Sequence, residues 1–538
     1  MSDRAVVIGA GPDGLVAAIA MARSGSKVTV LEAGSEPGGL LREIEFAPGF
    51  RAAPFAIDPG WLSPEVLRGV GLTRQPLEEA RPDPCLVAPL DGGLLELGPD
   101  VGATAARIRR VAPRDADRWG EFTGRMHRLA GALAPLYLAP APRIDAKGIA
   151  ELAGLARLGQ KVRGLGRVEM IEFLRIVPTA IAELLDEWFD SEPLKALLAS
   201  TALPDLCFGP RAGATAFGFL HHHVGQPVGT YGPRGLLAGG PRALVDVLME
   251  QARSAGVEIR TGVAVREIVV EGEGATGVEL DSGERLRAAE VISTLDPKRT
   301  MLELLDPVHL DPETIDAFRH LRLRPARTTV LLALERLPEL PGSGDGRALG
   351  GSYRVAPSLD YLERAADATK YGQTASEPWL DIRVPTLTTP ALAPGDQHVM
   401  VIHVQCTPYA LRGTSWEEER ERVADRAVAI AARSLPGLAE RILHRTVIAP
   451  PDAEQLLGVS EGAPTHGELM LDQILFMRPV AGWSRYAMPV PGVYLGGPGA
   501  HPGPGITGAA GWLAAQHALK GRGPPRGARS PSRTAGPD

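Results

Sequence analysis

Three glycines near the amino terminus have the spacing of a phosphate-binding turn. Gly9, Gly11 and Gly14 form the pattern G-x-G-x-x-G, with Pro12 and Asp13 between the last two glycines. The first glycine permits a tight turn, the second lets the backbone approach a pyrophosphate, and the third brings a helix close to a strand. Phosphate oxygens accept hydrogen bonds from the N–H groups at the start of such a helix. We therefore expect this turn to bind the pyrophosphate of a dinucleotide.

An acidic residue follows the turn where a dinucleotide presents a ribose. The surrounding sequence predicts a strand at 5–8, a helix at 15–23 and a second strand at 27–31 that leads into Glu32. A carboxylate at this place accepts hydrogen bonds from a ribose 2′-OH and disfavours the 2′-phosphate of NADP. A glycine-rich turn in an unrelated α/β protein is the alternative. The complete order of strand, turn, helix, strand and acid favours the dinucleotide site.

Two later features favour FAD over NAD. Gly38 and Gly39 form a diglycine just past the second strand, which is typical of large FAD-binding folds. A predicted helix at 241–254 leads into a strand at 258–260, and a β-meander with glycine-containing turns follows. Val265 lies near the start of the first meander strand, where FAD folds of this type contact the adenine through the backbone. An ordinary hairpin without a ligand contact is the alternative for Val265.

Three consecutive histidines and a tyrosine are the first candidates for proton transfer. His221, His222 and His223 lie inside the chain, and adjacent histidines on one element cannot all converge on one metal ion, so we expect no metal site. On a strand, the first and third would point one way and the second the other. We expect one or two of them, with Tyr231, to line a substrate cavity where an imidazole can take a proton. Packed, hydrogen-bonded histidines are the alternative.

Composition sets limits on the class of protein. The chain has 538 residues, a net charge of −7 and three widely spaced cysteines, Cys85, Cys207 and Cys406, without a CxxC pair. We therefore expect no nucleic-acid partner, no zinc ribbon and no disulfide framework. No signal peptide is evident, and no apolar run reaches the roughly 18 residues that span a membrane. These features predict a cytoplasmic protein.

The order of patterns predicts a discontinuous α/β fold. Residues from about 60 to 230 read as mainly helical, and those from about 305 to 460 mix strands with helices. We therefore predict a Rossmann-type FAD-binding domain and an α+β substrate domain inserted between its parts. The FAD-binding domain comprises residues 1–60, 232–300 and 461–519, the substrate domain comprises 61–231 and 301–460, and 520–538 form a disordered tail.

One basic stretch suggests a peripheral contact with a membrane. Residues 151–177 place Lys161, Arg163 and Arg167 among leucines, which is a pattern that can lie on a lipid surface. An ordinary pair of surface helices fits the same residues and is the favoured alternative.

The motifs together resemble the phytoene-desaturase-type flavoprotein family, including its branch of pyridine nucleotide-disulphide oxidoreductase domain-containing protein 2. The resemblance covers residues 4–520 and is carried by "VVIGAGPDGLVAA", "HHHVGQPVGTYGPRG", "AEVISTLDP", "WLDIRVPTLTTPALAPGDQHVMVIHVQCTPY" and "THGELMLDQILFMRPV". It implies noncovalent FAD, a monoamine-oxidase-like fold and hydride abstraction from C–H or N–H bonds. The chain departs from the branch near its end, where Pro498, Ala500 and Pro504 replace an alanine, a threonine and a glycine. The substrate therefore cannot be carried over.

The resemblance also assigns roles to the glycine-rich stretch "GGPGAHPGPGITG" near the carboxyl terminus. It implies that Gly505, Ile506 and Thr507 open the last helix, with their N–H groups facing the N1/C2=O edge of the flavin. Gly497 belongs to the same cofactor-binding run. His501 is expected either to border the flavin as a catalytic residue or only to hydrogen-bond the loop.

The leading hypothesis is an FAD-dependent dehydrogenase, desaturase or oxidase that acts on a small hydrophobic organic molecule. Oxygen or a quinone is the expected electron acceptor because no separate NAD(P)H domain is evident. A flavin amine oxidase or a redox-neutral FAD isomerase is the alternative, since one fold serves several chemistries. A third hypothesis is a non-catalytic binding protein of the Rab GDP-dissociation-inhibitor type.

Overall fold

The computed structural model describes most of the chain. The described residues are 4–72, 77–142, 159–160, 163–227, 229–232, 236–341 and 346–521. Residues 151–158, Lys161 and residue 162 of the basic stretch 151–177, and the predicted tail beyond residue 521, lie outside them.

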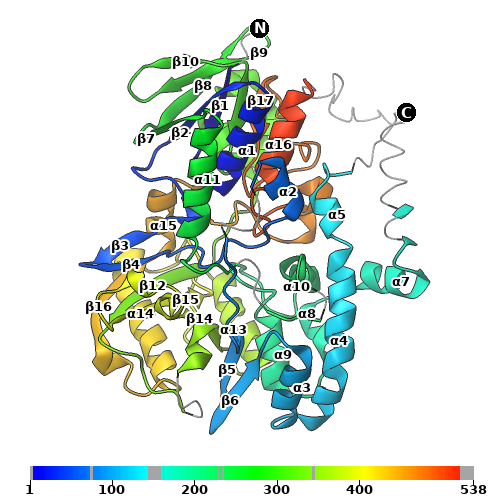
Figure 1. The fold of residues 1–538 in the computed structure, drawn as a ribbon, viewed down its shortest axis with the longest axis vertical. Helices are drawn as coiled ribbons and strands as arrows, with labels where there is room; N and C mark the ends of the chain where they lie inside the picture. The colour runs from blue at the N-terminus through cyan, green and yellow to red at the C-terminus, as the bar shows by residue number, and fades with distance from the viewer. Residues whose placement is uncertain are drawn as a thin grey trace.

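A parallel sheet forms the Rossmann-type part of the molecule (Figure 1). Its strands run in the order β17 (Val493–Leu495), β11 (Glu290–Ser293), β1 (Arg4–Ile8), β2 (Lys27–Glu32) and β7 (Glu258–Thr261), and every neighbouring pair is parallel. The run of four apolar residues in β1 suits a strand that is covered on both faces. Helix α1 (Pro12–Arg23) packs against both α11 (Arg242–Ser254) and α16 (Ala509–Leu519).

The predicted elements around the glycine turn are confirmed. The expected strands at 5–8 and 27–31 and the helices at 15–23 and 241–254 match β1, β2, α1 and α11 to within a few residues. The predicted meander is an antiparallel sheet of β8 (Val265–Glu271), β9 (Gly274–Leu280) and β10 (Arg285–Arg287).

A second large sheet lies in the other half of the molecule (Figure 1). In order, its strands are β16 (Ile442–Ile448), β12 (Arg327–Leu334), β15 (His398–Gln405), β14 (Leu380–Arg383), β13 (Ser352–Val355), β5 (Leu86–Leu90) and β6 (Gly93–Leu97). All neighbours are antiparallel except β13 and β5. The region from 60 to 230, expected to be mainly helical, thus also supplies two strands. They form a hairpin with each other, and β5 joins the sheet by pairing with the distant β13, which local propensity cannot reveal.

The remaining described helices are divided between the two halves of the molecule (Figure 1). They are α2 (Pro64–Gly69), α3 (Val101–Arg109), α4 (Pro113–Gly131), α5 (Ala134–Tyr137), α7 (Arg167–Ile176), α8 (Ile181–Asp186), α9 (Glu192–Ala199), α10 (Thr215–His223), α12 (Pro312–Arg319), α13 (Leu359–Lys370), α14 (Trp416–Ala432) and α15 (Pro450–Leu457). A short hairpin of β3 (Ile44–Ala47) and β4 (Phe50–Ala52) lies between the two halves.

Side-chain alternation gives the two faces of the second sheet different partners. On β12, Val330 and Leu332 belong to a core shared with α14, whereas Leu331 belongs to a core shared with the β3–β4 hairpin. This period of two is what a strand imposes on its side chains. The face of the sheet that contacts the hairpin carries polar residues toward one end of the strands.

The strands of the parallel sheet come from three stretches of chain that are far apart in sequence. This arrangement supports the discontinuous division of the chain into an FAD-binding and a substrate part, whose boundaries stay a proposal.

Candidate flavin and substrate site

One cavity of about 450 Å³ extends from the glycine turn to the second sheet. Its wall includes the turn after β1, the end of β2, the start of β8, the carboxyl-terminal glycine stretch and the polar face of the second sheet. Residues 55–60 line it between these parts. The cavity therefore connects the predicted dinucleotide turn with the predicted substrate region.

The glycine turn has the geometry that its spacing predicts. Gly9 has φ of +98°, in the left-handed region that glycine tolerates. A methyl group on Gly14 would overlap the carbonyl oxygen of Gly9, so this glycine sets the close approach of α1 to β1. Gly11 precedes α1 and lines the cavity together with Gly9 and Pro12. The bare backbone and the start of α1 form a cradle that fits a pyrophosphate.

Asp13 lies in the first turn of α1 and also lines the cavity. Burial raises the pKa of its carboxyl to about 7, although backbone N–H groups of Gly511 and Gly508 oppose that rise. A large share of Asp13 is then protonated at neutral pH, which limits its repulsion of a pyrophosphate.

Glu32 lies at the end of β2 with its carboxylate fixed by two backbone groups. Oε2 accepts a hydrogen bond from the N–H of Ala10 at 2.8 Å, and Oε1 accepts one from Gly34 at 2.9 Å. The side chain lines the cavity beside the turn. The position fits the ribose role that the sequence predicts.

Gly38 and Gly39 of the diglycine have different structural roles. Gly39, with φ of +53°, lines the cavity, and a methyl group added to it would come within 3.2 Å of the Cα of Gly11. Gly38 is not among the lining residues. Its N–H donates to the carbonyl of Ala10 at 3.0 Å, so Gly38 holds the diglycine against the glycine turn.

Val265 begins β8 and lines the cavity together with Val263 and Ala264. The N–H of Val263 donates to the carbonyl of Glu32 at 2.9 Å, which fixes this segment beside the end of β2. The site thus has an apolar wall next to the residue expected to hold the ribose.

The carboxyl-terminal stretch lines the cavity through Gly505, Ile506 and Thr507, but it does not open the last helix. Helix α16 begins at Ala509, after Gly508 with φ of +77°. Because Thr507 precedes the helix, its N–H is turned to the carbonyl of Trp61 at 3.1 Å and its hydroxyl to the carbonyl of Pro59. The expectation that the N–H of Thr507 faces the flavin is therefore wrong.

Gly497 does not line the cavity either. A methyl group there would overlap the carbonyl oxygen of Thr294, so the bare position lets β17 and its following turn pass close to the residues after β11. Its role in this structure is backbone packing.

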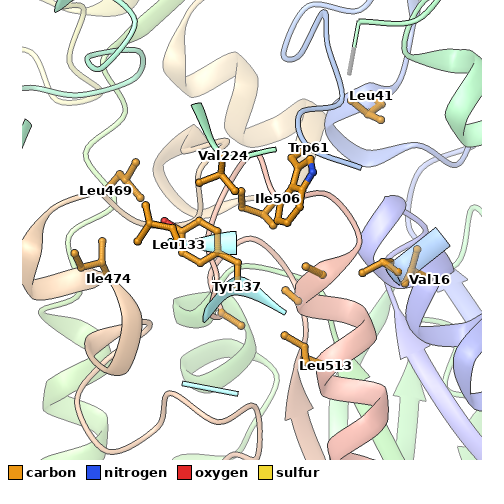
Figure 2. Close-up of a cluster of buried hydrophobic side chains, with 14 of the residues drawn as sticks. Val16, Leu41, Trp61, Leu133, Tyr137, Val224, Leu469, Ile474, Ile506 and Leu513 are labelled. Atoms are coloured by element: carbon orange, nitrogen blue, oxygen red, sulfur yellow. The ribbon is translucent and has the colours of Figure 1, made fainter. Parts of the chain in front are cut away.

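Ile506 anchors the stretch in a buried apolar cluster. Figure 2 shows its side chain beside Trp61 and Val224, with Leu133 and Tyr137 nearby. Gly505 accepts a hydrogen bond from the N–H of Trp61 at 2.8 Å. These contacts hold the turn at the wall of the cavity.

The three histidines end a helix, α10, rather than lying on a strand. His221 is fully buried, 2.7 Å from the Tyr137 hydroxyl through Nδ1 and 2.7 Å from the Pro504 carbonyl through Nε2. It therefore ties α10 to the carboxyl-terminal stretch. The alternation of directions considered for a strand therefore does not apply, because the helical period replaces the strand period.

His222 and His223 line the cavity, as expected. The Nδ1–H of His223 donates to the carbonyl of Phe219 at 2.7 Å, and the two rings stack at 4.0 Å between centroids. In the neutral imidazole this hydrogen bond leaves the basic lone pair on Nε2.

Tyr231 lies beside His223, with 5.4 Å between the ring centroids, and also lines the cavity. Its hydroxyl is buried, and no described residue forms a hydrogen bond with it. Burial raises the pKa of the phenol well above its usual range. The group therefore stays a neutral hydroxyl, and a buried polar atom without a partner indicates that a ligand supplies one.

His501 does not reach the cavity. Its side chain is fully buried, and Nε2–H donates to the carbonyl of Leu136 at 3.0 Å. Burial lowers the pKa of this imidazole to about 4. Of the two expectations for His501, the structure favours the loop-holding role, and the catalytic assignment is not supported.

The sequence analysis missed a buried ionic group on the second sheet. Cavity-lining residues on its strands and in the preceding loop are Asp205, Arg327, Ser352, Arg354, Asp381, Arg383, His403 and Gln405. Arg354 lies 3.3 Å from Asp381, Arg383 lies 3.2 Å from the same carboxylate, and Arg327 lies 3.2 Å from Asp205. Polar or charged side chains at alternate positions of otherwise apolar strands are the sequence signal that could have revealed this group, as with Asp381 and Arg383 in "LDIR" and His403 and Gln405 in "HVMVIHVQ".

The ionic group is strongly perturbed by its surroundings. Burial opposes ionisation of Asp381, but Arg354 and Arg383 more than offset it and hold its pKa well below the usual range. Burial, with help from Arg327, lowers the pKa of His403 to about 3, so this imidazole is neutral. Its Nε2–H donates to the carbonyl of Pro54 at 3.1 Å.

Comparisons with known proteins agree with this architecture. Family models match residues 7–61 as an NAD(P)-binding Rossmann-like domain and residues 144–372 as a flavin containing amine oxidoreductase. The chain is 32% identical over 536 residues to pyridine nucleotide-disulfide oxidoreductase domain-containing protein 2 of Mus musculus, covering 95% of this chain and 92% of that protein.

A more distant relative and a solved structure extend the comparison. The chain is 26% identical to a phytoene desaturase (neurosporene-forming) of Rhodobacter capsulatus, over 94% of this chain and 91% of that one. An oxidoreductase from Methanosarcina mazei has the same fold with a TM-score of 0.60 at 16% identity, over 96% of this chain and 100% of that one.

Proposed function

The chain belongs to the family of pyridine nucleotide-disulfide oxidoreductase domain-containing protein 2, within the amine oxidase and phytoene desaturase group of FAD-dependent oxidoreductases, and from this premise we propose that it oxidises a small organic molecule at a C–H or N–H bond. Bound FAD supplies the hydride acceptor. The observation that carries the proposal is the single cavity joining the glycine turn to His222, His223 and Tyr231.

The first task of the chain is to hold the cofactor. The backbone at Gly9 and Gly11, with the start of α1, would bind the pyrophosphate, and Glu32 the ribose. Val265 is proposed for the adenine side of the site. At the other end, the bare backbone at Gly505 would lie against the pyrimidine edge of the flavin. We propose noncovalent attachment, as the resemblance to the phytoene-desaturase-type family implies.

The second task is to orient the substrate and move a proton. The hydroxyl of Tyr231 is positioned to donate a hydrogen bond into the cavity. An imidazole of His222 or His223 would take the proton that leaves the substrate as hydride departs. Ile506 and its apolar neighbours give this end of the cavity an apolar wall, which would keep water from the reacting atoms.

Oxygen or a quinone is proposed as the electron acceptor, and the part of the substrate that reacts is proposed to be hydrophobic. Within the described residues only one parallel sheet of the Rossmann type is present. A second nucleotide domain for NAD(P)H is therefore not part of the proposal.

A flavin amine oxidase is the second candidate, favoured by the family model over residues 144–372. A redox-neutral isomerase that keeps reduced FAD would use the same site. An amine oxidase requires a substrate with an oxidisable amine, whereas an isomerase would show no net reduction of the flavin.

Anaerobic titration of the FAD-loaded protein tests the proposal. Bleaching of the visible flavin band by an amine, an alkane or an alkene carboxylic acid, followed by recovery with oxygen or a quinone, is the expected result. Conversion of a substrate without bleaching would favour the isomerase. A protein that cannot be loaded with FAD would contradict both oxidoreductase hypotheses.

We also propose a peripheral membrane contact through α7. Val168, Ile171 and Leu174 are 73%, 54% and 60% exposed and follow each other at helical spacing. Ion pairs of Arg128 with Glu169 and of Arg175 with Glu187 connect the helix to the rest of the protein. Within the described residues, no helix is long and apolar enough to cross a membrane.

Co-sedimentation with vesicles of phosphatidylglycerol and phosphatidylcholine tests this contact. Replacing Val168 and Leu174 with serine should weaken binding, whereas serine at Val308, which is 77% exposed elsewhere, should not. Equal binding of all three proteins would contradict the contact.

A further inference from the structure

We propose that the second sheet holds a carboxylate of the substrate, which makes the substrate a small organic acid with an apolar body. This inference rests on the proposed oxidoreductase function and names the substrate class of the same cavity. It is carried by an arginine patch, defined as Arg327, Arg354 and Arg383, on the polar face of the second sheet.

Strand geometry turns the arginine patch toward the cavity. On β14, Leu380 and Ile382 face the core shared with α14, so Asp381 and Arg383 face the opposite side. The register continues this polar face across neighbouring strands, pairing Asp381 with Arg354 on β13 and with His403 on β15. Four neighbouring positions of a buried sheet face, Arg354, Asp381, Arg383 and His403, are thus polar.

The charges in this group do not balance. Within the second sheet and the loop before it, three guanidinium groups face two carboxylates, Asp205 and Asp381, while His403 is neutral at its lowered pKa; the cavity-lining carboxylate of Asp58 belongs to the separate segment 55–60. Burying a charge without a partner is costly, so a buried group with one excess positive charge favours a bound anion. A neutral hydrocarbon in this part of the cavity would leave the excess charge uncompensated.

Arg383 has hydrogen-bond donors to offer. Its Nε donates to Asp381 at 3.2 Å, and among the described residues no acceptor contacts its two Nη atoms. Arg354 is more fully engaged, because its guanidinium donates to Ser352, Ser200 and Asp381. Arg383 is therefore the residue that would bind the carboxylate, with the planar fork that such groups match in two hydrogen bonds.

The remaining wall indicates the rest of the molecule. Leu206, Leu469 and Ile506 line the cavity beside the polar residues. Tyr231 provides its unpartnered hydroxyl between the arginine patch and the histidines. An apolar body that ends in a carboxylate satisfies both kinds of surface, whereas a polyene satisfies only one.

Titration calorimetry with benzoate and benzamide tests the charge requirement on the unaltered, FAD-loaded protein. The two probes share a shape and differ in charge. Benzoate is expected to bind at least about tenfold more tightly, the effect of one charge-assisted hydrogen-bond pair. Equal affinities, or tighter binding of benzamide, would overturn the inference without any variant.

Variants of Arg383 then test whether this residue binds the carboxylate. Arg383→Gln should remove the preference for benzoate, and Arg383→Lys should keep part of it because the charge remains. Arg445→Gln is the matched control, since Arg445 lies on β16 of the same sheet but pairs with Asp425 and Glu421 away from the cavity. An unchanged preference in Arg383→Gln, with normal FAD content, would overturn the assignment to Arg383.

The test separates this inference from the proposed function. A flavin that is bound and reducible, in a protein that does not distinguish benzoate from benzamide, would leave the oxidoreductase standing and overturn the organic acid. A protein that prefers benzoate but never takes up FAD would support the anion site and contradict the oxidoreductase.

Discussion

At the scale of residues, two glycines of the same turn are expected to respond differently to one added methyl group. A methyl on Gly11 would meet only the Cα of Gly39 at 3.8 Å and would otherwise face the cavity. A methyl on Gly14 would overlap the carbonyl oxygen of Gly9. One position is open to a ligand, and the other is closed by the fold itself.

Gly11→Ala should therefore lose FAD while the protein keeps its fold. We expect at least about tenfold weaker FAD binding, with stability of the flavin-free protein changed by no more than about 1 kcal/mol. Gly14→Ala should instead destabilise the flavin-free protein by roughly 1–3 kcal/mol. FAD titration and chemical denaturation measure the two effects, and normal FAD affinity in Gly11→Ala would contradict the pyrophosphate assignment.

Tyr231→Phe should separate stability from substrate binding. Because no described residue pairs with the buried hydroxyl, its removal should leave the flavin-free protein as stable as before or more stable by about 1 kcal/mol. FAD content should not change, and affinity for the substrate or for benzoate should fall. A large loss of stability would show that the hydroxyl has a structural partner instead.

Buried histidines should make the protein sensitive to acid. Burial lowers the folded-state pKa of His501 to about 4, below the unfolded value of 6.5. Between these values the unfolded chain binds the proton and the folded one does not, so stability is complete above pH 6.5 and falls as the pH drops toward 4. His501→Gln should lower the slope of the free energy of unfolding against pH by up to about 1.4 kcal/mol per pH unit, which corresponds to one proton. Chemical denaturation at pH 7 and pH 5 measures the free energy of unfolding of the unaltered protein and of His501→Gln. An equal loss of stability in both proteins between these pH values would contradict the prediction.

At the scale of elements, sequence reasoning succeeded where the pattern is local. Strand, turn, helix and acid between residues 4 and 32 are adjacent in the chain, so their types and spacing specify the unit. The cap of α9 is equally local: Ser191 precedes the helix and accepts a hydrogen bond from the N–H of Leu194.

Sequence reasoning failed where distant contacts decide. The histidines end helix α10, held by Tyr137 and the Pro504 carbonyl from far along the chain. Thr507 lies outside α16 because Pro59 and Trp61 take its hydroxyl and N–H. The ionic group is assembled from Asp205 and four strands, so its charges become neighbours only when the second sheet forms.

Gly511→Ala should disturb the packing of α16 on α1. A methyl at this position would overlap the carbonyl oxygen of Asp13, forcing the helices apart. We expect a loss of about 1–3 kcal/mol in stability and weaker FAD binding, because α16 follows the cavity-lining turn. Gly120→Ala on α4 is the control: nothing lies within 4 Å of the added methyl, and the helix should gain about 0.5–1 kcal/mol. Equal behaviour of both variants would contradict the close-packing argument.

At the scale of the whole molecule, the cavity depends on parts of the chain that lie far apart in sequence. The glycine turn lies near residue 10, the diglycine near 39, the start of β8 near 265 and the last turn near 505. The second sheet closes the far end with its polar face. A motif search finds the dinucleotide end because it is one continuous unit, whereas the substrate end has no single motif.

The central claim is that this assembled cavity holds FAD. The most direct measurement is the FAD content of the purified protein, before and after incubation with FAD, determined from the visible spectrum and from the flavin released by mild denaturation. We expect equimolar FAD that is released intact, with Gly11→Ala depleted of it under the same conditions. A folded protein that takes up no flavin, or a Gly11→Ala variant with full FAD content, would contradict the account.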